Sequence, residues 1–223
     1  MTLLLDSALI VDARQAAALG FIRGATTNPN LMAKAGRAPE LVIAELCEVL
    51  PGTIFYQLTA QNLAEREAEA RRMVAMHPDR IGLKIPCTLE NLALATRLVQ
   101  DGFTVGLTAI FSSAQVYLAC QAGVHYVLPY VNRSTRLLGD GFALVAEMRE
   151  VIEAGSYPVE IVAASVKSPE EAVQTLLAGA HHLTLPLAVI QSMGQHPLSD
   201  EAIADFSKNT RLTGATLSGE SQP

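Results

Sequence analysis

The feature that most constrains the fold is a regular alternation of short apolar runs with longer amphipathic segments along the whole sequence. The apolar runs have the length of strands, and the segments between them show the hydrophobic spacing of helices. Strands are predicted at residues 3–6, 24–29, 53–58, 81–85, 104–108, 126–130, 160–164 and 182–185. Helices are predicted at residues 12–19, 39–50, 62–76, 89–100, 112–121, 141–152, 169–177, 187–193 and 199–209.

Eight apolar strands separated by helices predict a parallel sheet that is covered on its outer face. The 223 residues are half hydrophobic and contain no domain-breaking linker, so we expect one α/β domain over residues 1–223, a (β/α)8 TIM barrel. The helix at 199–209 is then an addition to the barrel, and 210–223 is expected to be a loose tail. The alternative is an open doubly wound sheet, but the glycine-rich phosphate turn typical of that fold does not follow the first strand.

Composition excludes several classes of function. The net charge of −6 and the pI near 5.4 leave no basic surface for nucleic acid. No apolar run is long enough to cross a membrane, and the N-terminus has no basic segment typical of a signal peptide. Three widely separated cysteines, Cys47, Cys87 and Cys120, predict neither a zinc site nor a disulfide framework, so we expect a reducing, cytoplasmic setting.

The histidines do not predict a metal centre. All five lack the spacing of metal ligands, and His181 and His182 are adjacent at the start of a strand, so they point to opposite faces. These two are expected at the end of the barrel remote from the active site, and all five histidines are expected to be structural or to face solvent. We therefore expect neither a metal nor a cofactor.

Lys84 is the most informative single residue. It lies in the apolar run Ile81–Pro86, in a chain with only four lysines. Burial of an ammonium group lowers its pKa, and the neutral amine that results can attack a carbonyl carbon to form a Schiff base. The structural alternative is that the lysine stem packs in the core while its charged end reaches water.

Polar residues follow seven of the eight predicted strands. Because catalytic groups of a barrel lie at the C-terminal ends of its strands, we expect these side chains to meet in one site. Some of them have a structural alternative as turn formers. They are Asp6, Thr26 with Asn28, Gln57, Lys84, Thr108, Tyr130 with Asn132 and Arg133, and Ser165 with Lys167.

Several motifs resemble those of the small transaldolase family, which includes the fructose-6-phosphate aldolases. They are LLDSA (4–8), GATTNPN (24–30), GLKIPCT (82–88), GLTAIFSSAQ (106–115), YVLPYVNR (126–133), AASVKSP (163–169) and LTLPL (183–187). The resemblance implies a (β/α)8 barrel, a Schiff-base lysine at Lys84 and no metal. It also implies a homo-oligomer, usually a decamer built from pentamers, in which the C-terminal helix crosses to a neighbour.

Two positions distinguish branches of this family. Typical transaldolases have a glutamate after the third strand and a phenylalanine after the sixth, whereas this sequence has the aldolase pair Gln57 and Tyr130. Ile110 and Phe111, after Thr108, are more similar to the transaldolases. By this resemblance, Gln57, Thr108 and Tyr130 position a water that relays protons, and Asp6 and Asn28 hold the sugar hydroxyls.

Three residues can provide an anion site for a phosphate. Arg133 follows the sixth strand and can bind a phosphate in a bidentate manner. Ser165 and Lys167 follow the seventh strand, next to a predicted helix N-terminus that favours anions. The alternatives are a surface ion pair for Arg133 and a solvated charge for Lys167, and a sulfonated sugar would suit the same residues.

Three functions remain open from the sequence. The first is a class I aldolase that cleaves fructose 6-phosphate to dihydroxyacetone and glyceraldehyde 3-phosphate. The second is a transaldolase that transfers the dihydroxyacetone unit between sugar phosphates. The third is a barrel that binds sugar phosphates without catalysis.

Overall fold

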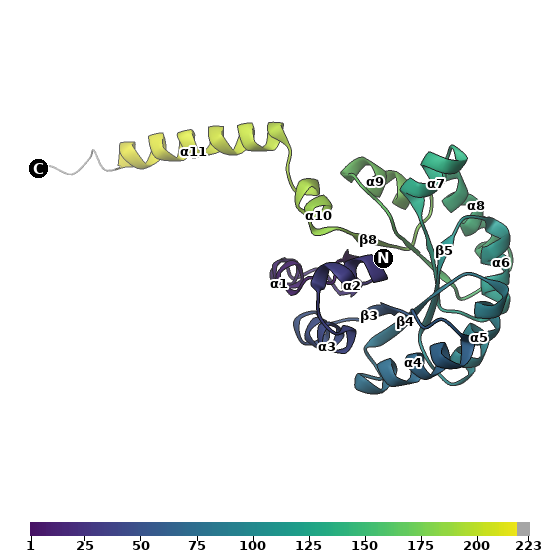
Figure 1. Ribbon diagram of the computed structural model, residues 1–223. Coiled ribbons are helices and arrows are strands. Elements are labelled where there is room, and N and C mark those ends of the chain that lie inside the picture. The colour runs from purple at the N-terminus through teal and green to yellow at the C-terminus, as the bar shows by residue number, and fades with distance from the viewer. Residues whose placement is uncertain (218–223) are drawn as a thin grey trace, which may run out of the picture. The chain divides into compact units, whose positions relative to one another are not determined.

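The computed structural model shows a closed barrel of eight parallel strands, in which each strand pairs with its neighbours in sequence and β8 closes on β1 (Figure 1). It describes the chain over residues 1–217, with side chains over residues 1–208. The strands are β1 (Thr2–Asp6), β2 (Gly24–Thr26), β3 (Ile54–Gln57), β4 (Ile81–Pro86), β5 (Val105–Ile110), β6 (Tyr126–Pro129), β7 (Glu160–Ala163) and β8 (His182–Leu185). The predicted (β/α)8 barrel is confirmed, and the open sheet is excluded.

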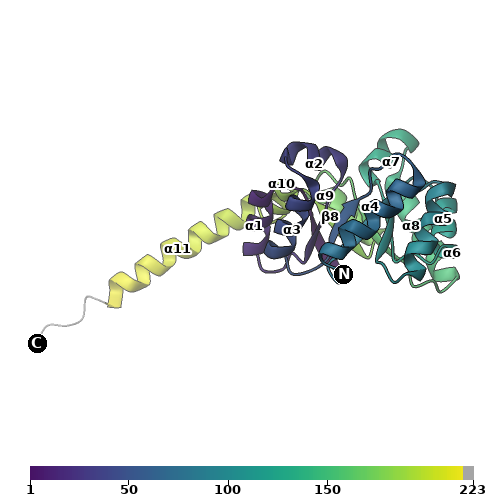
Figure 2. The same cartoon turned by 60° about the horizontal axis from the view of Figure 1, so that its bottom comes forward.

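Helices surround the barrel, and α4, α5, α6 and α8 follow one another along its outside in Figure 1, while Figure 2 shows the same barrel from another direction. The helices of the barrel unit are α1 (Ile10–Ala18), α2 (Pro29–Ala35), α3 (Pro39–Val49), α4 (Leu63–Met76), α5 (Leu89–Gln100), α6 (Ser113–Gln121), α7 (Val131–Leu138), α8 (Gly141–Ala154) and α9 (Pro169–Leu177). Two of these, α2 and α7, were not predicted, because the segments after Asn28 and Tyr130 were interpreted as turn and loop.

The loops at the C-terminal ends of the strands are held by helix caps. The side chains of Asn62, Thr88, Ser112 and Ser168 each accept a hydrogen bond from a backbone N–H in the first turn of the helix that follows. Such a cap stabilises a helix by about 1 kcal/mol and fixes its first residue. Each capped helix begins within a few residues of a strand end, so the loops at this end of the barrel are short and well defined.

An apolar cluster lies inside the barrel toward its N-terminal end, beside a second cavity of about 220 Å³. Leu4, Phe55, Leu128 and Val162 form a buried apolar cluster there, with Tyr126 against it. Gly82 of β4 lies under the Phe55 ring, whose carbon atoms would be 2.8 Å from a Cβ at this position. The absence of a side chain at Gly82 therefore leaves room for the Phe55 ring. Lys84 is the one polar side chain of β4 and lies nearer the C-terminal end of the strand.

The C-terminal helices form a separate compact unit, from Ala188 onward. They are α10 (Leu187–Met193) and α11 (Pro197–Leu217). The additional C-terminal helix was predicted, but its predicted end at residue 209 is wrong, because α11 extends to Leu217. Residues 210–217, predicted to be loose, are therefore helical. Residues 218–223 of the expected tail lie outside the described residues. Within residues 1–217, no helix has the length and apolar character needed to cross a membrane.

Candidate active site

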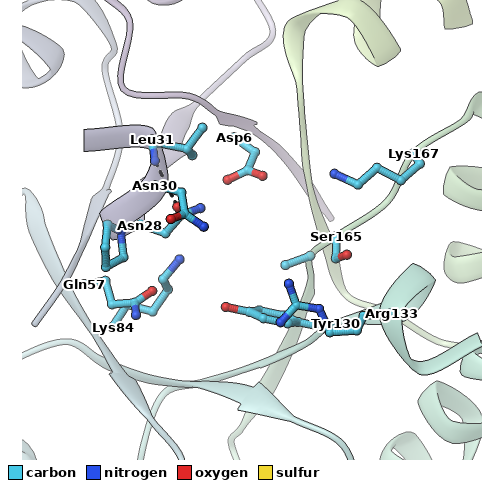
Figure 3. Close-up of a pocket in the computed structure, with 12 residues that line it drawn as sticks. Asp6, Asn28, Asn30, Leu31, Gln57, Lys84, Tyr130, Arg133, Ser165 and Lys167 are labelled. Carbon is cyan, nitrogen blue, oxygen red and sulfur yellow. Dashed lines mark hydrogen bonds between the residues drawn. The ribbon is translucent and has the colours of Figure 1, made fainter. Parts of the chain in front are cut away.

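A cavity of about 400 Å³ opens at the C-terminal ends of the barrel strands. Residues from β1, β3, β4 and the loops after β2, β6 and β7 form its wall, so its position is the one that barrel enzymes use. Its lining residues are Asp6, Asn28, Pro29, Asn30, Leu31, Gln57, Lys84, Tyr130, Arg133, Ala164, Ser165 and Lys167. Figure 3 shows the side chains of Lys84 of β4, Asp6 of β1 and Lys167 of the loop after β7 directed into this space.

Lys84 lies at the bottom of the cavity and is 3% exposed. Burial lowers the pKa of its amine to about 8, although the negative charge of Asp6 opposes this shift. A pKa near 8 leaves roughly a tenth of the amine neutral at pH 7, far more than for an ordinary lysine. Lys84 is thus buried and has a lowered pKa, as expected for a nucleophilic lysine.

Asp6 ends β1 and faces the same space. Burial raises the pKa of its carboxyl above the ordinary value, while the charge of Lys84 and a hydrogen bond from Thr26 oppose the shift. The Thr26 hydroxyl donates to Asp6 Oδ1 over 3.0 Å and lies 2.7 Å from the hydroxyl of Thr184. Because Thr26 donates to Asp6, Thr184 must donate to Thr26, and this chain of hydroxyl groups across β1, β2 and β8 fixes the carboxylate.

Gln57 and Thr108 contribute two buried polar atoms without partners. Gln57 Oε1 and Thr108 Oγ1 are inaccessible and have no hydrogen bond to any described residue. An unpaired buried polar atom costs about 1–3 kcal/mol, so its presence in a wall of the barrel requires an explanation. Gln57 is paired in register with Lys84, whereas Thr108 is paired with Pro86, two residues farther toward the C-terminal end of β4.

A β-bulge shapes β5 next to Thr108. The register with β6 shifts between Thr108 and Ile110, and Ala109 between them has a left-handed φ of 56°. A bulge of this kind redirects the side chains beyond it. Phe111, just past the bulge, contacts the Tyr130 ring edge-on with the ring centroids 5.8 Å apart.

Tyr130 and Arg133 form the opposite wall. Tyr130 follows β6 and makes an isolated bridge to Ala164, and its hydroxyl points toward Lys84 in Figure 3. Arg133, in the first turn of α7, lies over the Tyr130 ring with 5.1 Å between its guanidinium carbon and the ring centroid. The two side chains thus form one packed unit with an exposed cationic group.

Ser165 and Lys167 complete the cationic side of the cavity. Ser165 has a left-handed φ of 59°, which a residue with a Cβ rarely adopts and which is common at functional sites. The backbone N–H of Lys167 donates to Glu171 Oε2 over 2.7 Å, so the loop is tied to α9. The Lys167 side chain extends toward Asp6 in Figure 3, and its charge, like that of Lys84, opposes the rise that burial causes in the pKa of that carboxyl.

Helix α2 brings residues into the site that the sequence analysis did not assign. Asn28 Oδ1 accepts a 3.0 Å hydrogen bond from Leu31 N as the cap of α2, which leaves the Asn28 amide group facing the cavity. The next residues, Pro29, Asn30 and Leu31, line the cavity with it. A capping asparagine followed by proline, with Gly36 at the end, was a sequence signal for this helix.

Eight of the eleven predicted site residues line the cavity, and three do not. Thr26 and Thr108 are buried behind the wall, where Thr26 positions Asp6. Asn132 is turned away, because its side-chain N–H donates to Glu171 Oε1 over 2.6 Å. Asn132 and the loop of Lys167 thus share one carboxylate, so Asn132 joins α7 to α9 in this structure.

His181 and His182 lie at the opposite end of the barrel from this site. His182 contacts Glu160 through Nε2 over 3.0 Å, and His181 contacts Arg149 over 2.6 Å, both at the N-terminal ends of β7 and β8. In the described part of the chain, no three His, Cys, Asp or Glu side chains are grouped in a way that could hold a metal ion.

The fold and the cavity define a class of protein, a (β/α)8 barrel with a buried amine of lowered pKa at its catalytic end. A family model described as Transaldolase/Fructose-6-phosphate aldolase matches residues 3–218. The chain belongs to this family, and it is an enzyme of the transaldolase or aldolase type.

Curated relatives match over nearly their whole length. A protein named probable transaldolase from Pelotomaculum thermopropionicum is 38% identical over 206 residues, which cover 92% of this chain and 95% of that protein. A protein of the same name from Thermus thermophilus is 37% identical, and the match covers 92% of this chain and 96% of that protein. Another from Hyphomonas neptunium is 36% identical, and the match covers 96% of this chain and 99% of that protein. The predicted family is confirmed.

Proposed function

We propose that the protein is a class I aldolase that cleaves fructose 6-phosphate to dihydroxyacetone and glyceraldehyde 3-phosphate through a Schiff base on Lys84. The observation that supports this most is the buried amine of Lys84, with its pKa lowered to about 8, in a cavity that also holds Asp6 and two cations. A neutral amine beside a carboxylate has what carbonyl addition and proton transfer need.

The first steps form the electron sink. Lys84 Nζ attacks the C2 carbonyl carbon of the ketose, and the resulting carbinolamine loses water to give an iminium ion. Asp6 accepts the proton of the C4 hydroxyl, the C3–C4 bond breaks, and its electron pair forms an enamine. The C4 carbon leaves as the aldehyde of glyceraldehyde 3-phosphate.

The later steps need a proton at C3 and a water at C2. We propose that Gln57, Thr108 and Tyr130 position this water: Gln57 and Tyr130 line the cavity, and Thr108 lies buried behind its wall. Protonation of the enamine regenerates the iminium ion, and its hydrolysis releases dihydroxyacetone and the amine. The water lost in the first stage is thereby replaced.

The phosphate is proposed to lie at the other side of the cavity. The guanidinium of Arg133 and the ammonium of Lys167 are its cationic partners, with Ser165 between them. Asn28, on the side of Lys84, is proposed to hold the hydroxyl groups near C1 and C3. Because the anion site needs only charge and hydrogen bonds, a sulfonated ketose is an alternative substrate.

A transaldolase is the second candidate. Three curated relatives carry the name probable transaldolase, and Phe111 packs on Tyr130 in the place where this sequence is more similar to that branch. In that reaction the enamine is not hydrolysed but attacks an acceptor aldehyde. Gln57 and Tyr130 favour the aldolase, because typical transaldolases have a glutamate in place of Gln57 and a phenylalanine in place of Tyr130.

Borohydride trapping tests both candidates. The intact protein is treated with fructose 6-phosphate and borohydride, with Lys84→Met as the control, and free dihydroxyacetone is measured in parallel. An adduct on Lys84 with release of dihydroxyacetone is the expected result. An adduct without release, together with sedoheptulose 7-phosphate formation from added erythrose 4-phosphate, would establish the transaldolase. No adduct with phosphorylated or sulfonated ketoses would leave only a binding function.

The assembly is also a proposal. Leu198 and Ile203 of α11 are 67% and 60% exposed within one chain, which is unusual for large apolar side chains. We propose that α11 packs on another copy in a homo-oligomer, a pentamer or decamer, in the cytoplasm. The mass of the native particle before and after removal of residues 197–223 tests this, and a monomeric full-length chain would overturn it.

A further inference from the structure

We propose that Arg66 and Asn91 are positioning residues that hold the ends of β3 and β4, and therefore Gln57 and Lys84, at a fixed separation. The inference deepens the proposed function and rests on it for its catalytic part. Neither side chain lines the cavity. Both are well buried on the outside of the barrel, with Asn91 5% exposed and the Arg66 side chain 13% exposed.

Arg66, in the first turn of α4, binds the loop that follows Gln57. Its Nε donates to the carbonyl of Ala60 over 3.1 Å, and its Nη2 donates to the carbonyl of Gln61 over 3.0 Å. Its third donor, Nη1, reaches the next helix and donates to Asn91 Oδ1 over 2.5 Å. One planar guanidinium thus joins two carbonyls of one loop to the side chain of another element.

Asn91, in the first turn of α5, extends the connection to the strand of Lys84. Its side-chain N–H donates to the carbonyl of Pro86 over 2.8 Å, two residues beyond Lys84. Its backbone N–H is bound by the capping Thr88, which fixes the start of α5. The path from the Gln57 loop to the Lys84 strand therefore runs through two side chains and four side-chain hydrogen bonds.

A buried carboxylate fixes the same loop from the other side. Glu69, 5% exposed, accepts hydrogen bonds from the backbone N–H groups of Thr59 and Ala60, the Thr59 hydroxyl and the Tyr56 hydroxyl, over 2.7–3.0 Å. These bonds lower the pKa of Glu69 although its burial opposes this, so the group is an anion. The loop after Gln57 is therefore held at both its N–H and its C=O groups.

The Arg66–Asn91 contact differs in burial and position from the ion pairs that also connect α4 with α5. Arg71 of α4 contacts Asp101 at the end of α5 over 2.7 Å, and Arg97 of α5 contacts Glu67 of α4 over 3.0 Å. These pairs are exposed by 27–49% and lie farther from the catalytic ends of the strands. Exposed pairs of this kind contribute about 0–1 kcal/mol to stability. Among these connections between the described residues, the Arg66–Asn91 pair binds backbone carbonyls of the loop after Gln57 and of Pro86 at the end of β4.

The position of these atoms matters because both ends carry reacting groups. The proposed water beside Gln57 must lie close enough to attack C2 of the substrate, the carbon bonded to Lys84 Nζ. A displacement of about 1 Å in such a geometry can lower a rate by as much as a hundredfold. A loosened loop also admits water to Lys84, which raises the pKa of its amine toward the ordinary value. Both effects can be measured.

Three variants separate positioning from stability. Asn91→Ala removes both bonds of the side chain, and Arg66→Met removes the three donors but keeps most of the apolar stem. Asn91→Asp keeps an acceptor for Arg66 but loses the donor to the Pro86 carbonyl. Arg71→Gln is the matched control, because it breaks a connection between the same two helices away from the cavity.

Two measurements are made on each intact protein. The first is kcat and KM for release of dihydroxyacetone from fructose 6-phosphate. The second needs no substrate and is the pH dependence of reductive methylation of Lys84 by formaldehyde and cyanoborohydride, with unfolding temperature measured alongside. We expect kcat to fall about tenfold in all three variants with little change in KM, and the midpoint of Lys84 methylation to rise by about half a pH unit or more. Arg71→Gln should change neither.

Asn91→Asp is the most discriminating variant. It is expected to keep the folding stability through its pairing with Arg66 and still to lose kcat. Wild-type kcat and an unchanged methylation midpoint in all three variants would overturn the proposal. It would also be overturned if kcat fell only in proportion to the unfolding temperature, and fell in the same proportion in Arg71→Gln. If the wild type releases no dihydroxyacetone, the proposed function fails, whereas the methylation midpoints still test the positioning role.

Discussion

The guanidinium of Arg133 lies over the ring of Tyr130, with its central carbon 5.1 Å from the ring centroid. A cation in this position is attracted to the ring by about 0.5–2 kcal/mol, and it limits the movement of both side chains. The proposed phosphate partner is thus packed directly on the residue proposed to transfer protons. Substrate charge and proton transfer are therefore coupled through one contact, and Arg133 can be tested for both roles.

Replacement of Arg133 by methionine should weaken binding of the phosphorylated ketose. A hydrogen bond to a charged group contributes about 1.5–3 kcal/mol, which corresponds to a rise in KM of about tenfold to a hundredfold. The kinetics of fructose 6-phosphate cleavage measure this. The control reaction is addition of dihydroxyacetone to unphosphorylated glyceraldehyde, which has no phosphate and should lose much less. Equal losses in both reactions would assign Arg133 to the support of Tyr130 alone.

Lys84→Met should abolish trapping and also stabilise the protein. The pKa of Lys84 is about 8 when folded and 10.5 ordinarily, so below pH 8 the folded state carries the full cost of burying the ammonium. That cost is up to about 3 kcal/mol, and it is relieved as the pH rises from about 8 to 10.5. The variant should therefore unfold at a higher temperature at pH 7, with a smaller advantage at pH 10.

A matched control is Lys208→Met, because Lys208 is 74% exposed in α11 and its removal should change stability little. Unfolding temperatures of the three proteins at pH 7 and pH 10 decide the matter. A Lys84→Met variant that is less stable than the wild type at pH 7 would mean that the ammonium is well paired in the folded state.

The sequence predicted the barrel and most of the cavity for a physical reason. Strand ends in a parallel barrel all meet at one face, so Asp6, Gln57 and Lys84 could be brought together without knowing any distance. The sequence could not show which way a side chain turns after the strand. Asn132 is next to Arg133 in sequence, yet Asn132 binds Glu171 on α9, and only Arg133 faces the cavity.

Helices α2 and α7 were missed because local turn signals competed with short helical ones. Asn28 and Pro29 are typical of a turn and equally of a helix start, and a helix of seven residues has too few turns to show a clear hydrophobic period. The consequence was that Asn30 and Leu31 were not assigned to the site. The positioning role of Arg66 and Asn91 was also invisible in the sequence, because it depends on contacts between residues 25 positions apart.

The replacement Asp6→Asn should lower the pKa of Lys84 further. The negative charge of Asp6 raises the pKa of the amine, so an uncharged isostere removes that effect while Thr26 can still donate to the amide oxygen. The midpoint for methylation of Lys84 should fall below that of the wild type, although cleavage of fructose 6-phosphate is slowed by the loss of the proposed base. A midpoint that is unchanged or higher would show that Asp6 does not act on Lys84 through its charge.

The double replacement Gln57→Glu with Tyr130→Phe should shift the reaction from release to transfer. A carboxylate at residue 57 and the absence of the hydroxyl at residue 130 change which proton transfers are available around the proposed water, so the enamine should persist until an acceptor arrives. The measured quantity is the ratio of sedoheptulose 7-phosphate formed from erythrose 4-phosphate to dihydroxyacetone released. We expect this ratio to rise at least about tenfold, which is a change of about 1.4 kcal/mol between the two barriers.

The single variants show which residue decides the partition. Tyr130→Phe keeps the ring under Arg133, so a lower release with unchanged KM would assign the effect to the hydroxyl alone. Gln57→Glu introduces a carboxylate beside the buried amine, which should also raise the midpoint for methylation of Lys84. If neither the singles nor the double variant alters the ratio, these two residues do not determine the branch, and the contact of Phe111 with Tyr130 becomes the next candidate.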